Sequence, residues 1–213
     1  MLVSFTSLAQ PKTRTYLSDN KMVPREHNVD MQHMKLELAM DAKAGKVFGK
    51  ATHIFKTIQQ NVTTLFLDAP AMKFSKVMLD GVDVKYNTND KGLNVEFSDL
   101  EWGSEHKLEV WYEATPKKGL YFVGWNDPQN LSRKQIWSQG QGIDNRHWIP
   151  FYDEMNDKLT TEMIVTFDSK YKVLSNGEKI KEKENKDGTT TWHYKMQHPH
   201  APYLVMLGIG EYA

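Results

Sequence analysis

Apolar and polar residues alternate with a period of two along most of this chain, and this pattern constrains its fold more than any other feature. In the stretch 107–114, for example, Leu108, Val110 and Tyr112 alternate with charged or indole side chains. Successive side chains of a strand point to opposite faces, so a period of two indicates strands with one buried face. No stretch repeats apolar residues at helical spacing over three turns. The sequence therefore predicts an all-β fold, an antiparallel sandwich or saddle of many short strands.

Local irregularities of the alternation predict particular turns and bulges. Asp80-Gly81 separates the stretches 74–79 and 82–86, and Asp-Gly is a strong signal for a two-residue hairpin. Nearer the start of the chain, the apolar phase shifts between Met31 and Met34. Because one extra residue reverses the side-chain phase of a strand, we expect a β-bulge near His33.

A second hairpin is predicted near the end of the chain. Asn176-Gly177 and Asp187-Gly188 bracket the charged run 178–186. Charged side chains oppose pairing between the edges of sheets, so this run is expected to be a solvated edge strand and not a partner-binding tail.

Composition excludes several classes of function. The chain has 213 residues, a length compatible with a single β-sandwich domain. Lys plus Arg and Asp plus Glu are 27 each, so no basic field attracts nucleic acid. No apolar run approaches the roughly 20 residues of a membrane span. The chain contains no cysteine, so disulfides and thiolate metal sites are excluded.

The first residues have the composition of a targeting segment. Residues 1–9, MLVSFTSLA, are mostly apolar and end in a small-x-small pattern, as at a secretory cleavage site. We therefore expect residues 1–22 to form a leader outside the core, and the protein to be exported to the periplasm or the extracellular space. The alternative is a disordered leader on a cytoplasmic protein.

The sequence contains no recognisable reaction centre. Zinc peptidases need two histidines one helical turn apart with a glutamate between them, and none of the eight histidines has this spacing. His198-Pro199-His200 is the nearest pair, but proline excludes a helix interior there. A Gly-x-Ser-x-Gly turn and a phosphate-binding glycine loop are also missing. We therefore expect no catalytic residue and no metal ligand in this chain.

One stretch, 138–158, departs from the strand-and-turn pattern. It reads SQGQGIDNRHWIPFYDEMNDK and sets polar side chains among the large aromatic residues Trp148, Phe151 and Tyr152. Apolar frames around a few placed polar groups are typical of recognition surfaces. An ordinary β-loop would not need two amides followed by an arginine and carboxylates. The polar residues are Gln139, Gln141, Asp144, Asn145, Arg146, His147, Asp153 and Glu154.

This stretch resembles the N-terminal domain of aminopeptidase N-like zinc metallopeptidases, the gluzincins of peptidase family M1. The family pattern is roughly Q-x-[EQ]-x-x-x-x-R-x-x-x-P-x-x-D-E-P-x-x-K. Weaker resemblance extends over 115–122 and 200–212, so most of the chain is covered. This sequence departs from the family at three positions. Met155 stands where the family usually has Pro, Phe151 where many members have Cys, and Thr161 where Phe is common. The matching positions are Gln139, Gln141, Arg146, Pro150, Asp153, Glu154 and Lys158.

The resemblance implies that residues 23–213 are a single N-terminal β-domain of a larger aminopeptidase. The parent would hold zinc in a separate downstream catalytic domain and remove N-terminal residues from peptides. This domain's partners would then be a peptide with a free N-terminus and its own catalytic domain. We expect the 213-residue chain alone to be inactive and to need no cofactor.

The resemblance also assigns roles to individual residues. It gives part of the recognition of the substrate α-amine to Gln141, with Gln139 lining the same subsite. The chemistry fits, because an ammonium only donates hydrogen bonds and a glutamine carbonyl oxygen accepts them. Alternatively, both amides satisfy backbone groups of an irregular loop. Arg146 is expected to form a bidentate pair with Asp144 or Asp153. The expected structural set is Asp144, Arg146, Pro150, Asp153, Glu154 and Lys158.

Two other classes of function remain open on the sequence. A stand-alone carbohydrate-binding sandwich would present a flat row of exposed aromatic residues. A catalytically dead scaffold related to these peptidases would have a downstream domain that lacks the zinc ligands. Against the first alternative, the remaining tryptophans are expected at core or half-buried strand positions. They are Trp102, Trp111, Trp125, Trp137 and Trp192.

Overall fold

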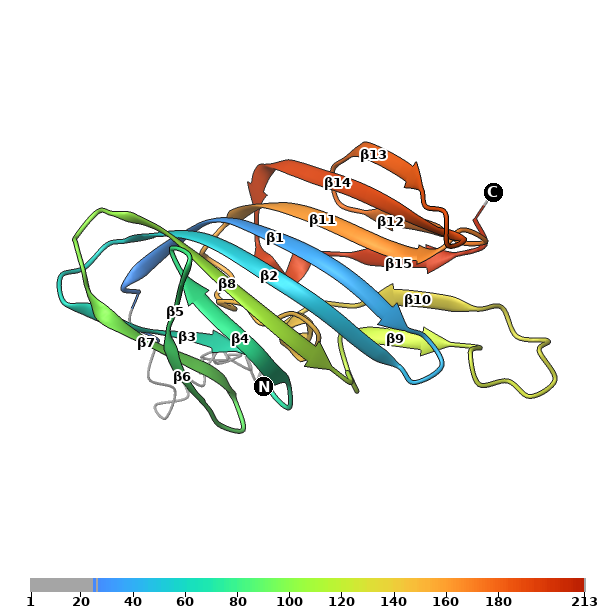
Figure 1. Ribbon diagram of the computed structural model, residues 1–213, viewed down its shortest axis with the longest axis horizontal. Helices are drawn as coiled ribbons and strands as arrows, with labels where there is room; N and C mark the ends of the chain where they lie inside the picture. Colours follow the sequence, from blue (N-terminus) through green and yellow to red (C-terminus); the bar gives the residue numbers. More distant parts are fainter. Residues whose placement is uncertain (1–24, 26, 213) are drawn as a thin grey trace, which may run out of the picture.

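The computed structural model describes residue 25 and residues 27–212, which form fifteen strands and two short 3-10 helices in three sheets (Figure 1). The predicted leader, residues 1–22, lies outside the described residues, so export stays a prediction. The elements are β1 (Val29–Asp41), β2 (Lys46–Thr57), β3 (Val62–Asp68), β4 (Lys73–Leu79), β5 (Val82–Asp83), β6 (Lys85–Thr88), β7 (Gly92–Leu100), β8 (Glu105–Ala114), β9 (Leu120–Val123), β10 (Gln135–Ser138), η1 (Asp144–His147), β11 (Leu159–Asp168), β12 (Lys172–Ser175), β13 (Glu178–Glu184), β14 (Thr189–His200), η2 (Pro202–Leu204) and β15 (Leu207–Gly210).

The largest sheet has eight strands in the order β13-β14-β11-β1-β2-β8-β4-β5. Its long strands bury every second side chain, as the alternation predicts. In β8, for example, Leu108, Val110, Tyr112 and Ala114 are buried. The expected all-β, antiparallel-dominated fold is confirmed. A feature that the alternation did not reveal is that β1 and β11 pair in parallel.

Two smaller sheets complete the fold. One has the order β12-β15-β10-β9 and the other β3-β7-β6. Apolar residues from both join those of the large sheet in one buried cluster, for example Leu65 of β3, Ile136 of β10 and Ile209 of β15. The three sheets therefore share one hydrophobic core. Among the described residues, no helix is long and apolar enough to cross a membrane.

Several local predictions are confirmed. The register of β1 with β2 shifts between Met31 and His33, where the bulge was expected. Asp80 and Gly81 both have positive φ, at 51° and 84°, as a tight hairpin turn between β4 and β5 requires. Every residue of β13 is exposed, and β13 is an edge strand paired only with β14. The hairpin predicted near the end of the chain is found, because the charged run forms β13 and pairs with β14 across Asp187-Gly188, while Asn176-Gly177 joins it to β12, which pairs with β15.

Other local predictions need correction. The stretch 82–86 is not one strand, because the chain changes sheets at Val84, whose N–H donates to Val77 O at 3.1 Å. Trp102 is 66% exposed in the turn between β7 and β8, and is therefore neither a core nor a half-buried residue.

Candidate functional site

The motif stretch 138–158 forms the connection from β10 to β11. It contains η1, and it is anchored to the end of β3 by a pair of backbone hydrogen bonds. Asp68 N–H donates to Phe151 O at 2.9 Å, and Phe151 N–H donates to Asp68 O at 3.2 Å. The aromatic residues of this stretch, Trp148, Phe151 and Tyr152, are buried. They pack the loop onto the core.

Gln139 and Gln141 are exposed immediately after β10. Gln139 N–H donates to Gly119 O at 2.8 Å, which fixes the backbone at the start of the loop. Between the two side chains, Gln139 Nε2 lies 3.5 Å from Gln141 Oε1. Neither side-chain amide satisfies a backbone group among the described residues, contrary to the alternative interpretation of these amides.

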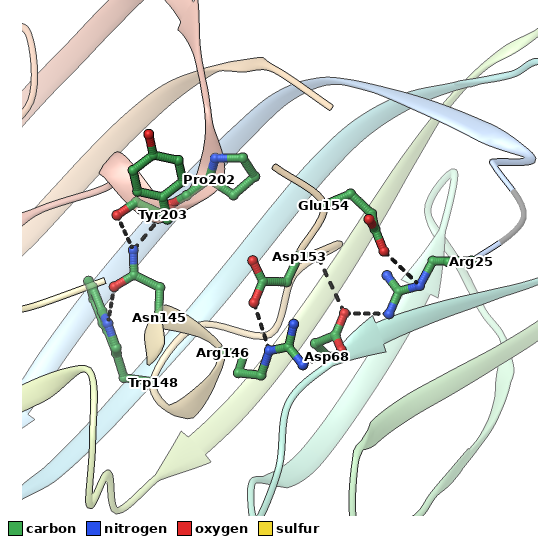
Figure 2. A network of polar contacts seen from close by, with 9 residues as sticks. All are labelled: Arg25, Asp68, Asn145, Arg146, Trp148, Asp153, Glu154, Pro202 and Tyr203. Atoms are coloured by element: carbon green, nitrogen blue, oxygen red, sulfur yellow. Dashed lines mark hydrogen bonds and ion pairs between the residues drawn. The ribbon is translucent and has the colours of Figure 1, made fainter. Parts of the chain in front are cut away.

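Arg146 pairs with two carboxylates and not with one (Figure 2). Its Nε donates to Asp153 Oδ2 at 2.7 Å, and its second contact is from Nη1 to Asp68 Oδ1 at 3.1 Å. The expected bidentate pair is therefore replaced by a bridge, in which Asp68 was not foreseen. Asp144 forms no ion pair with the described residues. Its charge instead acts on His147, where it opposes the lowering of the His147 pKa by burial.

A second arginine extends this network. Arg25 Nη2 contacts Asp68 Oδ2 at 2.6 Å, and its Nε lies 3.4 Å from Glu154 Oε1 (Figure 2). The guanidinium also lies 4.6 Å from the ring centroid of Tyr152. Glu154 is thus half-buried against the segment that precedes β1. Because Arg25 is outside the motif, its part in the network could not be read from the motif's spacing.

Burial changes the acid–base properties of the network. The side chain of Asp153 is only 2% exposed, and burial raises the pKa of its carboxyl while Arg146 opposes that rise. Asp153 N–H also donates to Asp68 Oδ2 at 3.3 Å. Charged groups this deeply buried persist when they are paired and hydrogen-bonded. The arrangement therefore fixes the loop and leaves these charges unavailable to a substrate.

Pro150 is held through its carbonyl group. Its oxygen accepts a hydrogen bond at 2.9 Å from Nε2 of His53, a fully buried residue of β2. A carbonyl oxygen only accepts, so this nitrogen carries the proton of a neutral imidazole. Burial lowers the pKa of His53 to about 4, which keeps the ring neutral. The motif does not predict this role of His53, because His53 lies 97 residues from its partner.

The end of the motif is less constrained. Lys158 is exposed and forms no ion pair within the described part of the chain. Beside it, the buried Asp157 accepts hydrogen bonds from Met31 N–H at 3.2 and 3.3 Å. Burial raises the pKa of Asp157 to about 6. Asp157 therefore stabilises the bulge of β1, a role that was not predicted.

Asn145 is the most completely hydrogen-bonded side chain of the motif, and its role was also missed. It is 1% exposed, and its Nδ2 donates to Pro202 O at 3.1 Å and Val205 O at 3.0 Å. Its Oδ1 accepts from Trp148 Nε1 at 2.9 Å (Figure 2). Asn145 thus ties η1 to the η2 segment. The residues next to Asn145 in the sequence, Asp144 and Arg146, do not indicate that its side chain binds the η2 segment.

No group of three or more His, Cys, Asp or Glu within residues 25 and 27–212 is arranged to hold a metal ion. His200 of the His-Pro-His pair is buried, and its Nε2 lies 3.0 Å from Thr161 Oγ1. The donor set for a structural or catalytic zinc is therefore not found among these residues.

Comparisons with known proteins agree with this architecture. The sequence pattern described as the peptidase M1 N-terminal domain matches residues 23–204. A leucyl aminopeptidase from Saccharolobus solfataricus is 24% identical over 155 residues, which are 73% of this chain and 19% of that protein. An M1 zinc metallopeptidase mutant from Deinococcus radiodurans, bound to a Tyr-Ser-Ala substrate, has TM-score 0.74 at 20% identity. The match covers 86% of this chain and 42% of that one.

A second solved structure gives the same result. A two-domain M1 zinc metallopeptidase mutant bound to L-arginine has TM-score 0.74 at 20% identity, over 87% of this chain and 43% of that chain. The fold and the motif together define the N-terminal β-domain of a metallopeptidase. The chain belongs to the peptidase M1 family, whose N-terminal domain it matches over most of its length. It spans less than half the length of these solved relatives and about a fifth of the curated one.

Proposed function

We propose that this chain is the non-catalytic N-terminal domain of a zinc aminopeptidase, and that Gln141, assisted by Gln139, binds the α-amine of the peptide substrate. The observation that carries the proposal is a contrast within the motif. Its charged residues 146 and 153 are paired, and its aromatic residues are buried, whereas the two amides face solvent. Polar side chains left free on a fixed loop are suited to binding a ligand.

The hydrogen-bonding capacity of Gln141 supports this role. Its Oε1 has two lone pairs, and the 3.5 Å contact with Gln139 Nε2 uses at most one of them. A substrate ammonium can donate to the other. Because the glutamine is neutral, no unpaired charge has to be desolvated before the substrate arrives. Gln139, whose Nε2 donates to Gln141 Oε1, then orients that oxygen for the substrate.

The hydrolytic step is assigned to a different part of the parent protein. Residues 25 and 27–212 contain no group of three or more His, Cys, Asp or Glu arranged to hold a zinc ion. The proposed contribution of this chain is to hold the amino end of a peptide, which fixes the first peptide bond relative to the hydrolytic groups. Such positioning lowers the entropic part of the barrier.

We further propose that the outward face of the four-stranded sheet contacts the catalytic domain. Trp137 is 40% exposed there and stacks on Tyr121 at 4.7 Å, beside the exposed Val123 and Leu174. Exposed apolar side chains gathered on one sheet are typical of an interface. β10, which carries Trp137, continues directly into Gln139, so a domain docked on this face would lie next to the proposed amine site.

The aromatic pair of Tyr121 and Trp137 bears on the carbohydrate-binding alternative, which requires a flat row of exposed aromatic residues. The other strongly exposed tryptophan, Trp102, lies in the β7–β8 turn and belongs to neither strand of this pair. Figure 1 shows that turn at the left of the molecule and β10 to the right of its centre. Calorimetric titration with oligosaccharides is expected to give no heat. Saturable binding that is lost in Trp137→Ala would favour a sugar-binding module.

Kinetics of the full-length protein test the amine role. Gln141→Ala is expected to raise KM and to lower kcat/KM by an amount equivalent to about 1–3 kcal/mol of transition-state binding, the range for removing one partner of a hydrogen bond. Lys158→Ala, in an exposed residue of the same loop, is the control and should leave kcat/KM unchanged. Unchanged kinetics in Gln141→Ala would return that residue to a structural role. A full-length protein without peptidase activity would support the scaffold alternative.

A further inference from the structure

The loop that carries Gln139 and Gln141 is packed against a single buried amide. A Cβ atom built on Gly140 would lie 2.2 Å from Asn145 Nδ2 and 2.5 Å from Tyr203 O. Both distances are far below a van der Waals contact, so only glycine fits at position 140. The backbone between the two glutamines therefore passes through a slot formed by the Asn145 side chain and the η2 backbone.

The slot is rigid because every polar atom of the Asn145 side chain is used. Its nitrogen donates to Pro202 O and Val205 O, with Tyr203 O at 3.4 Å, and its oxygen accepts from the Trp148 indole. The Asn145 carbonyl also accepts from the N–H groups of Trp148 and Ile149. An amide held on all sides cannot change rotamer without leaving buried groups unpaired.

A second asparagine holds the same η2 segment from the exposed side. Asn176 Nδ2 donates to Leu204 O at 3.0 Å, and its Oδ1 accepts from Met206 N–H at 2.7 Å. Asn176 has the same chemistry and the same target segment as Asn145. However, the groups that crowd Gly140 are Asn145 and Tyr203, and not Asn176. The chain therefore contains a matched control for the role of Asn145.

We propose that Asn145 is a positioning residue for substrate binding. It fixes the backbone at Gly140 and thereby sets the direction of the Gln141 amide towards the substrate α-amine. This inference rests on the proposed function of Gln141 and extends it to a residue that never touches the substrate. If Asn145 only stabilised the fold, the variants Asn145→Ala and Asn176→Ala would differ only in their free energy of unfolding. If Asn145 positions Gln141, the two variants should also differ in how well the protein distinguishes a ligand with an amine from one without it.

The test measures amine discrimination in the full-length protein. The probes are leucinol and 4-methylpentan-1-ol, which is the same molecule without its amino group. Neither contains an amide bond that the protein could hydrolyse, and both are used as competitive inhibitors. We expect the ratio of their inhibition constants to fall by about tenfold or more in Asn145→Ala, the size of one lost hydrogen bond to a charged group. In Asn176→Ala the ratio should stay that of the wild type.

The outcomes separate this inference from the proposed function. If Gln141→Ala keeps the wild-type ratio, the amine role of Gln141 is wrong. If Gln141→Ala loses discrimination while Asn145→Ala keeps it, only the positioning role is overturned. An equal loss in Asn176→Ala would also overturn it, because the effect would then come from the η2 segment in general.

A second variant covers the case in which Asn145→Ala does not fold. Gly140→Ala keeps every hydrogen-bonding group but forces the backbone at 140 out of the slot. Circular dichroism and thermal unfolding would establish that this variant is folded. Lost discrimination in a folded Gly140→Ala protein supports the inference, and wild-type discrimination contradicts it.

Discussion

Asp68 lies at the last position of β3, where its carboxylate contacts two arginines from distant parts of the chain. Arg25 and Arg146 lie 2.6 and 3.1 Å from its two oxygens, and the Asp68 backbone pairs with Phe151. One residue thus connects the segment before β1, the three-stranded sheet and the motif loop. The motif predicted Arg146 and Asp153, but it contained no information about this third partner. A local signal does exist, because an acidic residue ends the apolar run 65–67.

Removing the bridging guanidinium should therefore be costly. In Arg146→Met, the buried carboxylates of Asp68 and Asp153 lose a counter-charge, and the free energy of unfolding should fall by about 3 kcal/mol. Asp144→Asn is the matched control, since Asp144 was an equally plausible partner on sequence grounds but forms no ion pair in the described structure. Chemical denaturation measures both. A loss in Asp144→Asn as large as that in Arg146→Met would contradict the assignment.

Two buried titratable groups should give opposite pH dependence of stability. The pKa of His53 is lowered from 6.5 to about 4, so its contribution is present above pH 6.5 and is lost as the pH falls towards 4. The pKa of Asp157 is raised from 3.8 to about 6, so its contribution is present below pH 3.8 and is lost as the pH rises towards 6. Each pKa shift corresponds to about 3 kcal/mol in the free energy of unfolding. Between pH 4 and 6 the two effects oppose each other.

Single substitutions should separate the two contributions. Asp157→Asn keeps an acceptor for Met31 N–H but removes the ionisable group, so this variant should lose stability on acidification more steeply than the wild type. His53→Gln should show the reverse trend and gain stability as the pH falls from 6 to 4. Melting temperatures measured across this range test both variants. Parallel curves for wild type and variants would show that neither group titrates as described.

At the scale of elements, the sequence predicted the structural features that depend on residues close together in the chain. The bulge of β1 and the turn at 80–81 follow from local phase and local dihedral preference, and both were found. The break at Val84 was missed because its cause is a bond to β4, which alternation does not encode. The same limit applies to the parallel pairing of β1 with β11, whose partners are over 120 residues apart. Within the site, the motif predicted the loop and its arginine, whereas Asn145 and His53 gain their roles from distant backbone carbonyls.

The outward face of the four-stranded sheet makes a prediction about domain contact. If the catalytic domain covers Trp137, burial of the indole should stabilise the full-length protein by about 2–3 kcal/mol. Trp137→Ser should remove this stabilisation and lower the melting temperature. Trp102→Ser is the control, because Trp102 is 66% exposed in the β7–β8 turn, away from this sheet. Differential scanning calorimetry compares the two. Equal melting temperatures for both variants would place the domain contact elsewhere.

At the scale of the whole molecule, one core supports two surfaces that differ in composition. The three sheets bury a single apolar cluster, which makes the domain a rigid support. The eight-stranded sheet ends in the charged edge strand β13, while the four-stranded sheet presents exposed apolar residues and ends in the amide loop. The polar contacts of Figure 2 join the motif loop to the segment before β1, to the end of β3 and to the η2 segment. The proposed division of work follows, with binding of the amino end here and hydrolysis in a neighbouring domain.

A crystal structure of the full-length protein with bound leucinol, which has the amine but no amide bond to hydrolyse, tests the proposed amine site most directly. The decisive quantity is the distance from Gln141 Oε1 to the α-nitrogen of the ligand. We predict a hydrogen bond of roughly 2.7–3.2 Å, with the Asn145 amide still in contact with Gly140. A bound ligand whose α-nitrogen is held by other residues, with Gln141 turned away, would contradict the proposed role of Gln141.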